Sequence, residues 1–173
     1  MSVESNSKSD SLSRGGGDLA LRATNVSTCG FSLIHYNVCS LRDDSRLDML
    51  LHELDAVNWD VVAINETKRE DQIEHFQVNE KHMFYGAGGC KNRRGVGFLV
   101  HERLGECKFT PTDETLAVLK LVSDVGNLWI CSVYIPDTTY SDEEVLAVYA
   151  NLDRVVAQAR SQHAKCVVAG DIG

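Results

Sequence analysis

Apolar and polar positions in the first third of the chain predict a strand, a helix and a second strand. The run FSLIHYNV, which begins at Phe31, is typical of a strand that ends near Asn37. Leucines recur at helical spacing between Arg46 and Val57, which favours an amphipathic helix with one apolar face. The run VVAIN, residues 61–65, is continuous and rich in β-branched side chains, as expected of a buried strand. This order predicts a βαβ unit with parallel strands.

The middle of the chain predicts antiparallel hairpins. Short runs of strand type follow one another with turn residues between them, and they read MFYGAG, GVGFLVH, ECKFTP, TLAVLKLV and NLWICSVYI. Short strands at this spacing favour a meander or a set of hairpins. Glycines surround the basic cluster KNRR, residues 91–94, and place it at the tip of a loop. That tip is either a solvated loop or a clamp for phosphate.

A second helix is predicted to begin after Ser141. Ser141 and Glu144 have the spacing of a capping box, in which the serine caps the helix and the glutamate reaches back. Apolar residues then recur on one helical face, and they are Val145, Val148, Tyr149, Leu152, Val155, Val156 and Ala159. The run CVVAGD, residues 166–171, is the last predicted strand.

The N-terminal segment differs from the rest of the chain. Residues 1–28 are rich in serine, glycine and charge, and such a segment buries too little apolar surface to offset the entropy of ordering. We expect a disordered arm over 1–28 and one folded domain over 29–173. A targeting peptide is the alternative for this arm, but Glu4, Asp10 and Asp18 interrupt it.

Charge and cysteine content narrow the function classes. The net charge of −8 argues against binding nucleic acid by bulk positive charge, but it is compatible with carboxylates gathered around a cation. The six cysteines form no C-x-x-C pair and are interpreted as reduced thiols. With no apolar signal core and no apolar run of membrane-spanning length, we expect an intracellular protein of the nucleus or cytoplasm that is neither secreted nor membrane-bound.

Candidate chemistry lies at the ends of the predicted strands, in Asn37, Glu66, Tyr134 and Asp171. In open α/β sheets, functional groups sit just beyond the carboxyl ends of strands, because the loops there surround a crevice. Glu66 and Asp171 could share a hard cation, which prefers oxygen ligands. Asn37 could add a neutral oxygen or orient a bound group, and Tyr134 could donate a hydrogen bond to a phosphoryl oxygen.

Each of these residues also has a purely structural interpretation. Glu66 fits an ordinary loop residue or helix cap, and Asp171 fits a turn. Tyr134 fits a half-buried aromatic on a strand, and Asn37 fits an Asx-turn. The sequence pattern by itself leaves both interpretations open.

Several stretches taken together resemble the endonuclease/exonuclease/phosphatase superfamily. In order, they are YNVCSLR, INETK, RRGVGFLV, SVYIPDTTYSDEE and VVAGD, and the resemblance extends from Phe31 to Asp171. The closest likeness is to craniofacial development protein 2-like proteins and to the endonuclease domains of non-LTR retrotransposons. The resemblance implies an α/β fold, a four-layer sandwich of two mixed sheets flanked by helices, and divalent-metal-dependent hydrolysis of phosphodiesters.

The resemblance also implies roles for the strand-end residues. Glu66 is similar to the family's principal metal ligand, for Mg2+ or Mn2+, and Asn37 is similar to its active-site asparagine. Tyr134 is similar to the tyrosine that contacts phosphate. Asp171 is similar to the aspartate of the G-D-x-N motif, which positions or activates the attacking water. Nucleic acid is the partner that the resemblance implies.

Departures from the family pattern change the expectation for activity. Gly173 stands where the family has the asparagine of its G-D-x-N motif, and Cys39 stands where some members have an acidic residue. The family's later motif, which supplies the catalytic histidine, is not found, and none of the six histidines lies in a matching context. We therefore expect the N-terminal part of the sandwich with its C-terminal half missing, weak metal binding, and no activity of the chain alone.

Two further expectations follow from a half-domain. The inner faces of GVGFLV, TLAVLKLV and LWICSVY should be partly uncovered and open to association. CVVAGD should be either a sheet edge or an interior strand that lacks a neighbour. The alternative to an enzyme is a non-enzymatic remnant or partner-binding fragment derived from a mobile element. A phosphatase acting on a soluble phosphoester is a third, weaker account.

Overall fold

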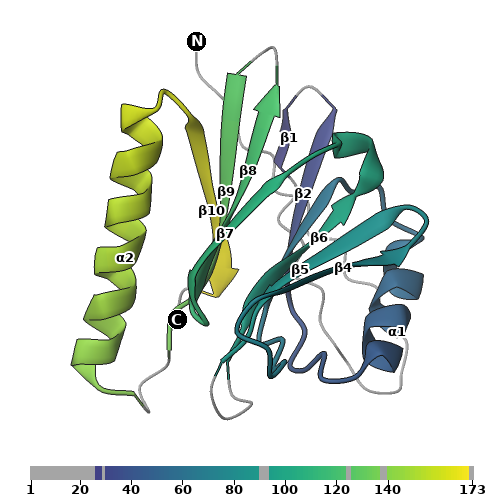
Figure 1. Ribbon diagram of the computed structural model, residues 1–173, viewed down its shortest axis with the longest axis horizontal. Helices are drawn as coiled ribbons and strands as arrows, with labels where there is room; N and C mark the ends of the chain where they lie inside the picture. The colour runs from purple at the N-terminus through teal and green to yellow at the C-terminus, as the bar shows by residue number, and fades with distance from the viewer. Residues whose placement is uncertain (1–25, 29, 90–93, 124–125, 137–139, 172–173) are drawn as a thin grey trace.

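The structure is a computed structural model that describes residues 26–28, 30–89, 94–123, 126–136 and 140–171. They form two β-sheets with a helix on the outer face of each (Figure 1). The six-stranded sheet has the order β1 (Val26–Thr28), β2 (Phe31–Asn37), β3 (Val61–Asn65), β6 (Val96–His101), β5 (His82–Ala87) and β4 (Glu74–Asn79). The four-stranded sheet has the order β10 (Lys165–Asp171), β9 (Gly126–Tyr134), β8 (Leu116–Ser123) and β7 (Lys108–Asp113).

The predicted βαβ unit is present. Strands β2 and β3 pair in parallel, with Asn37 opposite Asn65 at their carboxyl ends, and every residue of β3 is buried. Helix α1 (Asp44–Leu54) connects them; its N-cap Asp43 accepts a hydrogen bond from the backbone N–H of Arg46. The helix ends at Leu54, ahead of the predicted end at Val57. The four buried leucines of α1 pack on the outer face of the six-stranded sheet.

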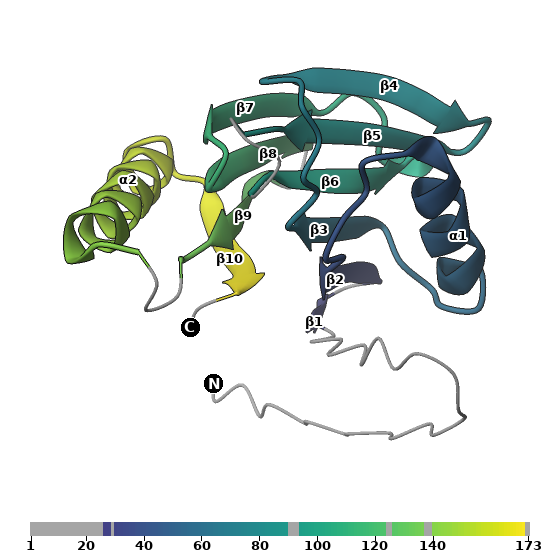
Figure 2. The same ribbon diagram turned by 90° about the horizontal axis from the view of Figure 1, so that it is seen from below.

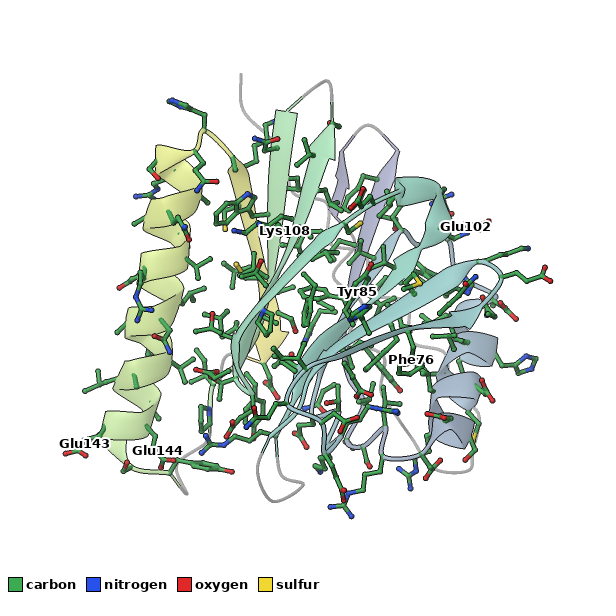
Figure 3. The ribbon with its side chains drawn as sticks, in the orientation of Figure 1. Phe76, Tyr85, Glu102, Lys108, Glu143 and Glu144 are labelled. Carbon is green, nitrogen blue, oxygen red and sulfur yellow. The ribbon has the colours of Figure 1, made fainter. Side chains whose placement is uncertain are left out.

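The predicted hairpins are also present, with one addition. The pairs β5–β6, β7–β8 and β8–β9 are antiparallel, as expected from the middle of the sequence. Strand β4, which pairs with β5, was not predicted. Its sequence EHFQVN offers two apolar side chains, Phe76 and Val78, and both pack toward α1 (Phe76 in Figure 3). A strand of such polar composition is identified only by its neighbour in the sheet.

Helix α2 (Asp142–Ser161) forms the crossover between the parallel strands β9 and β10. Its capping box is present: Ser141 Oγ accepts from Glu144 N, and the Glu144 carboxylate accepts from Ser141 N. The predicted apolar face is only partly buried. Val148 and Ala159 are buried, whereas Tyr149 is 42% exposed.

The two sheets pack face to face, so the molecule has four layers in the order α1, six-stranded sheet, four-stranded sheet, α2 (Figure 2). This confirms the predicted α/β sandwich of two mixed sheets flanked by helices. Between the sheets, Tyr85 of β5 meets Phe109 of β7 with ring centroids 5.5 Å apart (Tyr85 in Figure 3). The layer between the sheets is built from both of them, with Phe98, Leu119 and Ile130 fully buried.

The expectation of uncovered inner faces is wrong. It assumed that one half of the fold offers a single sheet, but this chain supplies both sheets and they close on each other. The outer faces of β8 and β9 are covered by α2. Strand β10 does lie at an edge of its sheet, as expected, and its Val168 is 36% exposed.

The folded part begins before residue 29. Strand β1, Val26–Thr28, pairs with β2 and so lies inside the segment that was expected to be disordered. Residues 1–25 lie outside the described residues.

None of the helices in the described residues combines the length and the apolar character needed to cross a lipid bilayer.

Candidate functional site

Three of the four candidate residues meet at one edge of the sandwich. The Asn37 amide nitrogen Nδ2 donates to Glu66 Oε1 at 2.9 Å and to Asp171 Oδ2 at 3.2 Å. Asn37 ends β2, Glu66 directly follows β3, and Asp171 ends β10 of the other sheet. Two carboxylates from different sheets therefore share one amide group.

The orientation of the Asn37 amide is set by its own loop. Its oxygen Oδ1 accepts a hydrogen bond from the backbone N–H of Cys39 at 3.0 Å, which is an Asx-turn contact. The Asx-turn interpretation therefore holds, and it coexists with the role in the site. Because Oδ1 is engaged in this way, Asn37 presents its NH2 group to the carboxylates rather than the neutral oxygen ligand that the sequence suggested.

The fourth candidate, Tyr134, is aligned with Asp171. The two residues are paired in the parallel ladder between β9 and β10, and the Tyr134 N–H donates to the carbonyl of Thr115 at 2.8 Å. Tyr134 is half-buried and packs against the core between the sheets. This matches the structural interpretation of the residue, and contact of its hydroxyl with phosphate stays a prediction.

A close approach of two strands places Asp171. Gly170 lies opposite Val133, and a Cβ added at Gly170 would collide with the Val133 carbonyl oxygen. The Ile135 N–H then donates to the Asp171 carbonyl at 3.0 Å, which fixes the end of β10. The glycine before the aspartate therefore has a steric reason: any side chain would push β10 away from β9.

Asn65 links the two sheets beside the site and was not singled out from the sequence. Its Nδ2 donates to the Val133 carbonyl at 2.8 Å, and its Oδ1 accepts from Ser132 Oγ at 3.0 Å. Both side chains are fully buried. An amide in an otherwise apolar buried run, such as VVAIN, is the sequence feature that indicates a satisfied polar contact of this kind.

The loops of the site contain unusual backbone conformations. Cys39, Glu66 and Lys68 have φ values of 57°, 58° and 53°, in the left-handed region that side chains other than glycine rarely adopt. Such conformations cost free energy and persist where the surrounding structure fixes them, often at functional sites. Here, the fixing contacts include Leu41 N to the Thr67 carbonyl at 2.8 Å.

Lys68 adds positive charge to the site. Its ammonium lies 3.1 Å from Glu66 Oε2, with both side chains about three-quarters buried, at 26% and 21% exposure. One oxygen of Glu66 therefore faces Asn37 and the other faces Lys68. The site carries two carboxylates and one adjacent cation.

His35, on β2, senses the charge of Asp171. Burial lowers its pKa, and the charge of Asp171 acts in the opposite direction. Its Nε2 is buried without a hydrogen-bond partner. Sequence reasoning set all six histidines aside, because none lies in a context that matches the family's histidine motif. Only the fold brings β2 and β10 close to each other.

The basic cluster KNRR is described only at Arg94, since residues 91–93 lie outside the described residues. Arg94 Nη2 donates to Glu144 at 2.9 Å, and its guanidinium lies over the Tyr140 ring at 4.3 Å. The Arg94 side chain therefore joins the start of β6 to the start of α2, which is a structural role.

The donor set fits a hard divalent cation with few protein ligands. Among the residues the structure describes, no three His, Cys, Asp or Glu side chains gather to hold a metal. Glu66 and Asp171 provide two carboxylates linked through Asn37. Mg2+ commonly binds one or two carboxylates and completes its shell with water and substrate phosphate.

Solved structures of several nucleic-acid enzymes share this fold. An AP endonuclease from Leishmania major matches with a TM-score of 0.61 at 13% identity, covering 82% of this chain and 54% of that one. The endonuclease domain of TRAS1, a telomere-specific non-LTR retrotransposon, matches at 0.54 and 12%, with coverages of 82% and 58%. A 3′ phosphatase from Neisseria bound to a product DNA hairpin matches at 0.56 and 16%, with coverages of 80% and 56%.

These likenesses show the fold alone, and the chain spans little more than half the length of each of these structures. No curated protein sequence matches the chain. A model of the Endonuclease/Exonuclease/phosphatase family matches residues 34–172, which includes every strand-end residue described above. The chain therefore belongs to the endonuclease/exonuclease/phosphatase family.

Proposed function

We propose that the strand-end site of Asn37, Glu66, Tyr134 and Asp171 is a divalent-metal site for phosphodiester hydrolysis. The main support is that a single amide group holds two carboxylates from different sheets. The loops beside it also contain three residues in the left-handed conformation. Two acidic groups held this close repel each other, so an arrangement that keeps them together is suited to a shared cation.

Glu66 is the principal ligand in this proposal, with Mg2+ or Mn2+ as the ion. When bound there, the ion supplies positive charge that stabilises the charge developing on a phosphoryl oxygen. Asn37 orients both carboxylates through its NH2 group. Lys68, which pairs with Glu66, adds positive charge that would favour a bound phosphate.

Asp171 and Tyr134 act on the substrate side of the site. The exposed carboxylate of Asp171 orients the attacking water and accepts its proton. Tyr134, at the end of the neighbouring strand, donates a hydrogen bond to a phosphoryl oxygen. We propose DNA as the substrate class, because the fold is shared with enzymes named for abasic-site cleavage and 3′-phosphate removal.

Low turnover of the chain alone is part of the proposal. The only general base offered by these four residues is a carboxylate, and His35 has a pKa lowered by burial and an Nε2 enclosed without a partner. We therefore expect metal binding to be easier to detect than cleavage.

The test measures metal binding and cleavage separately. Mn2+ added to the isotopically labelled chain should broaden NMR signals of Asn37, Glu66 and Asp171, and Glu66→Gln should remove this broadening. Cleavage of DNA with an abasic site, however slow, should require Mg2+ or Mn2+ and disappear in Glu66→Gln. Glu80→Gln makes the same charge change at an exposed position and should leave both measurements unchanged.

Two outcomes would contradict the proposal. Mn2+ broadening that is centred elsewhere would remove the metal site, and cleavage that survives Glu66→Gln would belong to another protein in the sample. Parallel assays on 3′-phosphorylated DNA and on a soluble phosphoester distinguish a nuclease from a phosphatase. Metal binding at the site without any turnover would favour the non-enzymatic alternative.

A further inference from the structure

Two cysteines face each other beneath α2, away from the strand-end site. Cys131 lies on β9 and Cys166 on the neighbouring parallel strand β10 (Figure 1). In the ladder, Cys166 is opposite Trp129 and Cys131 is opposite Val168, so the two cysteines are two positions apart and share one face of the sheet. Their sulfur atoms are 3.8 Å apart, within hydrogen-bond distance for thiols.

The two thiols differ in accessibility. Cys131 is fully buried in the core between α2 and the four-stranded sheet, whereas Cys166 is only partly buried against that core. A small reagent from solvent would therefore reach Cys166 first. The second thiol is held behind it, at a fixed distance.

The contact between the sulfurs also separates their acidities. The contact with Cys131, in which either thiol can donate, lowers the pKa of Cys166 to about 7; burial opposes this shift, and the charge of Arg160 on α2 assists it. The same hydrogen bond raises the pKa of Cys131, and burial raises it further. The more accessible sulfur is therefore the one with thiolate character, which is the form that reacts with oxidants.

We propose that Cys131 and Cys166 form an oxidant-responsive pair that a peroxide converts into an intramolecular disulfide. In the first step the Cys166 thiolate attacks one peroxide oxygen: an S–O bond forms, the O–O bond breaks, and the leaving hydroxide takes up a proton to become water. Cys166 is oxidised to a sulfenic acid and the peroxide is reduced.

In the second step the Cys131 sulfur attacks the Cys166 sulfenic sulfur. The S–S bond forms, the S–O bond breaks, and the Cys131 proton leaves with the hydroxide as a second water. The sulfurs must approach from 3.8 Å to about 2.05 Å. Diagonal neighbours on adjacent strands are about 7–8 Å apart, so closing the bond also requires the edge strand β10 to shift against β9. A fully buried resolving thiol at this distance favours the disulfide over further oxidation of Cys166.

The disulfide has a structural consequence. It would close the chain segment that runs from β9 through α2 to β10, and it would tie β10 to β9, its neighbour in the sheet that the described residues form. Strand β10 carries Asp171 at its end. Oxidation would therefore restrain the strand that delivers one carboxylate to the strand-end site, whether or not that site hydrolyses phosphodiesters.

The test uses the full chain reduced with dithiothreitol and then exposed to hydrogen peroxide. We expect the mass to fall by two hydrogens, peptide mapping to identify a Cys131–Cys166 cross-link, and the reduced mass to return with dithiothreitol. Cys166→Ser and Cys131→Ala should each abolish the cross-link, and Cys39→Ser, at an exposed cysteine, should retain it. Iodoacetamide labelling of Cys166 should reach half of its limiting rate below about pH 8.5, the range of an ordinary thiol, because its pKa is lowered.

Three results would overturn the proposal. They are a cross-link to any other cysteine, irreversible oxidation of Cys166 without a cross-link, and labelling of Cys166 that rises only above about pH 8.5, the range of an ordinary thiol. Circular dichroism of each variant shows whether it folds. If Cys131→Ala does not fold, the peptide map of the unmodified chain still decides the question.

Discussion

At the scale of single residues, the site depends on two asparagine side chains whose contacts cannot be predicted from the sequence pattern. Asn37 uses its oxygen for an Asx-turn and its NH2 group for two carboxylates. Asn65 uses both ends of its amide to join the sheets. Asn37 was expected at a strand end, but the direction of its amide comes from the conformation of the Cys39 loop. Asn65 was read only as part of a buried strand.

Replacing Asn37 should weaken metal binding. In Asn37→Ala, the NH2 group that holds Glu66 and Asp171 is lost, together with the Asx-turn acceptor, and no new ligand is added. Removal of such a supporting contact typically weakens metal affinity by about 10–100-fold. Isothermal titration with Mn2+ measures the change. Asp48→Asn, at an exposed position, is the control, and equal affinity in all variants would show that Asn37 does not organise the site.

Replacing Asn65 should destabilise the whole fold. Asn65→Ala leaves the buried Val133 carbonyl and the Ser132 hydroxyl without one partner each. Leaving buried polar groups unpaired costs about 1–3 kcal/mol of the free energy of unfolding. Urea unfolding followed by tryptophan fluorescence measures it, and Asn58→Ala at an exposed loop position should cost little. Equal losses in the two variants would contradict the bridging role.

At the scale of elements, local sequence rules account for most of the starts and ends. Asp43 caps α1, and the Ser141–Glu144 box caps α2. The parallel pairing of β2 and β3 follows from the predicted βαβ unit. Two features escaped these rules: β4, which has a polar sequence, and the exposure of Tyr149 on α2. The formation of β4 and the exposure of Tyr149 depend on the neighbouring elements rather than on the local sequence.

The cap of α2 provides a test at this scale. In Ser141→Ala, the hydroxyl that accepts from the Glu144 N–H is lost. Removing such a cap costs about 1 kcal/mol. Ser141→Asp supplies another capping acceptor and should recover most of that stability. Thermal unfolding of the unmodified chain, Ser141→Ala and Ser141→Asp compares their stabilities. A Ser141→Asp variant no more stable than Ser141→Ala would rule out the capping contribution.

At the scale of the whole molecule, closure of two sheets on each other produces both the core and the site. The sheets meet through Phe98, Leu119 and Ile130, and the same closure brings β10 beside β2 and β3. The sequence indicated many short strands but assigned them to a half-domain with open faces. The sequence did not reveal that the strands form two sheets, because the pattern of apolar residues in a strand does not show which other strands it pairs with.

Stability of the whole molecule should fall in mild acid. Burial, and then the nearby His101, lower the pKa of His82 in the folded chain. Below pH 6.5, the ordinary value, the unfolded chain takes up a proton that the folded chain resists, so the free energy of unfolding decreases until the folded pKa is passed. Above pH 6.5, His82 is neutral in both the folded and the unfolded chain, so it no longer makes the free energy of unfolding depend on pH.

Urea unfolding at about pH 7.5 and about pH 5.5 measures this dependence. His82→Gln should reduce the difference between the two conditions, and His52→Gln should not, since the His52 side chain is 91% exposed. A difference that is unchanged in His82→Gln would assign the acid sensitivity to other groups.

The sequence by itself determined most of the local elements, the cap of α2, the α/β class and the strand ends at which polar residues occur. These follow from short-range effects: side-chain periodicity, capping and β-branched runs act over a few neighbours. Only the tertiary structure decided which strand ends meet. The contact between Asn37 and Asp171 joins residues 134 positions apart, and the two cysteines beneath α2 are 35 positions apart. Contacts at such separations depend on how two sheets pack, and no local pattern encodes that packing.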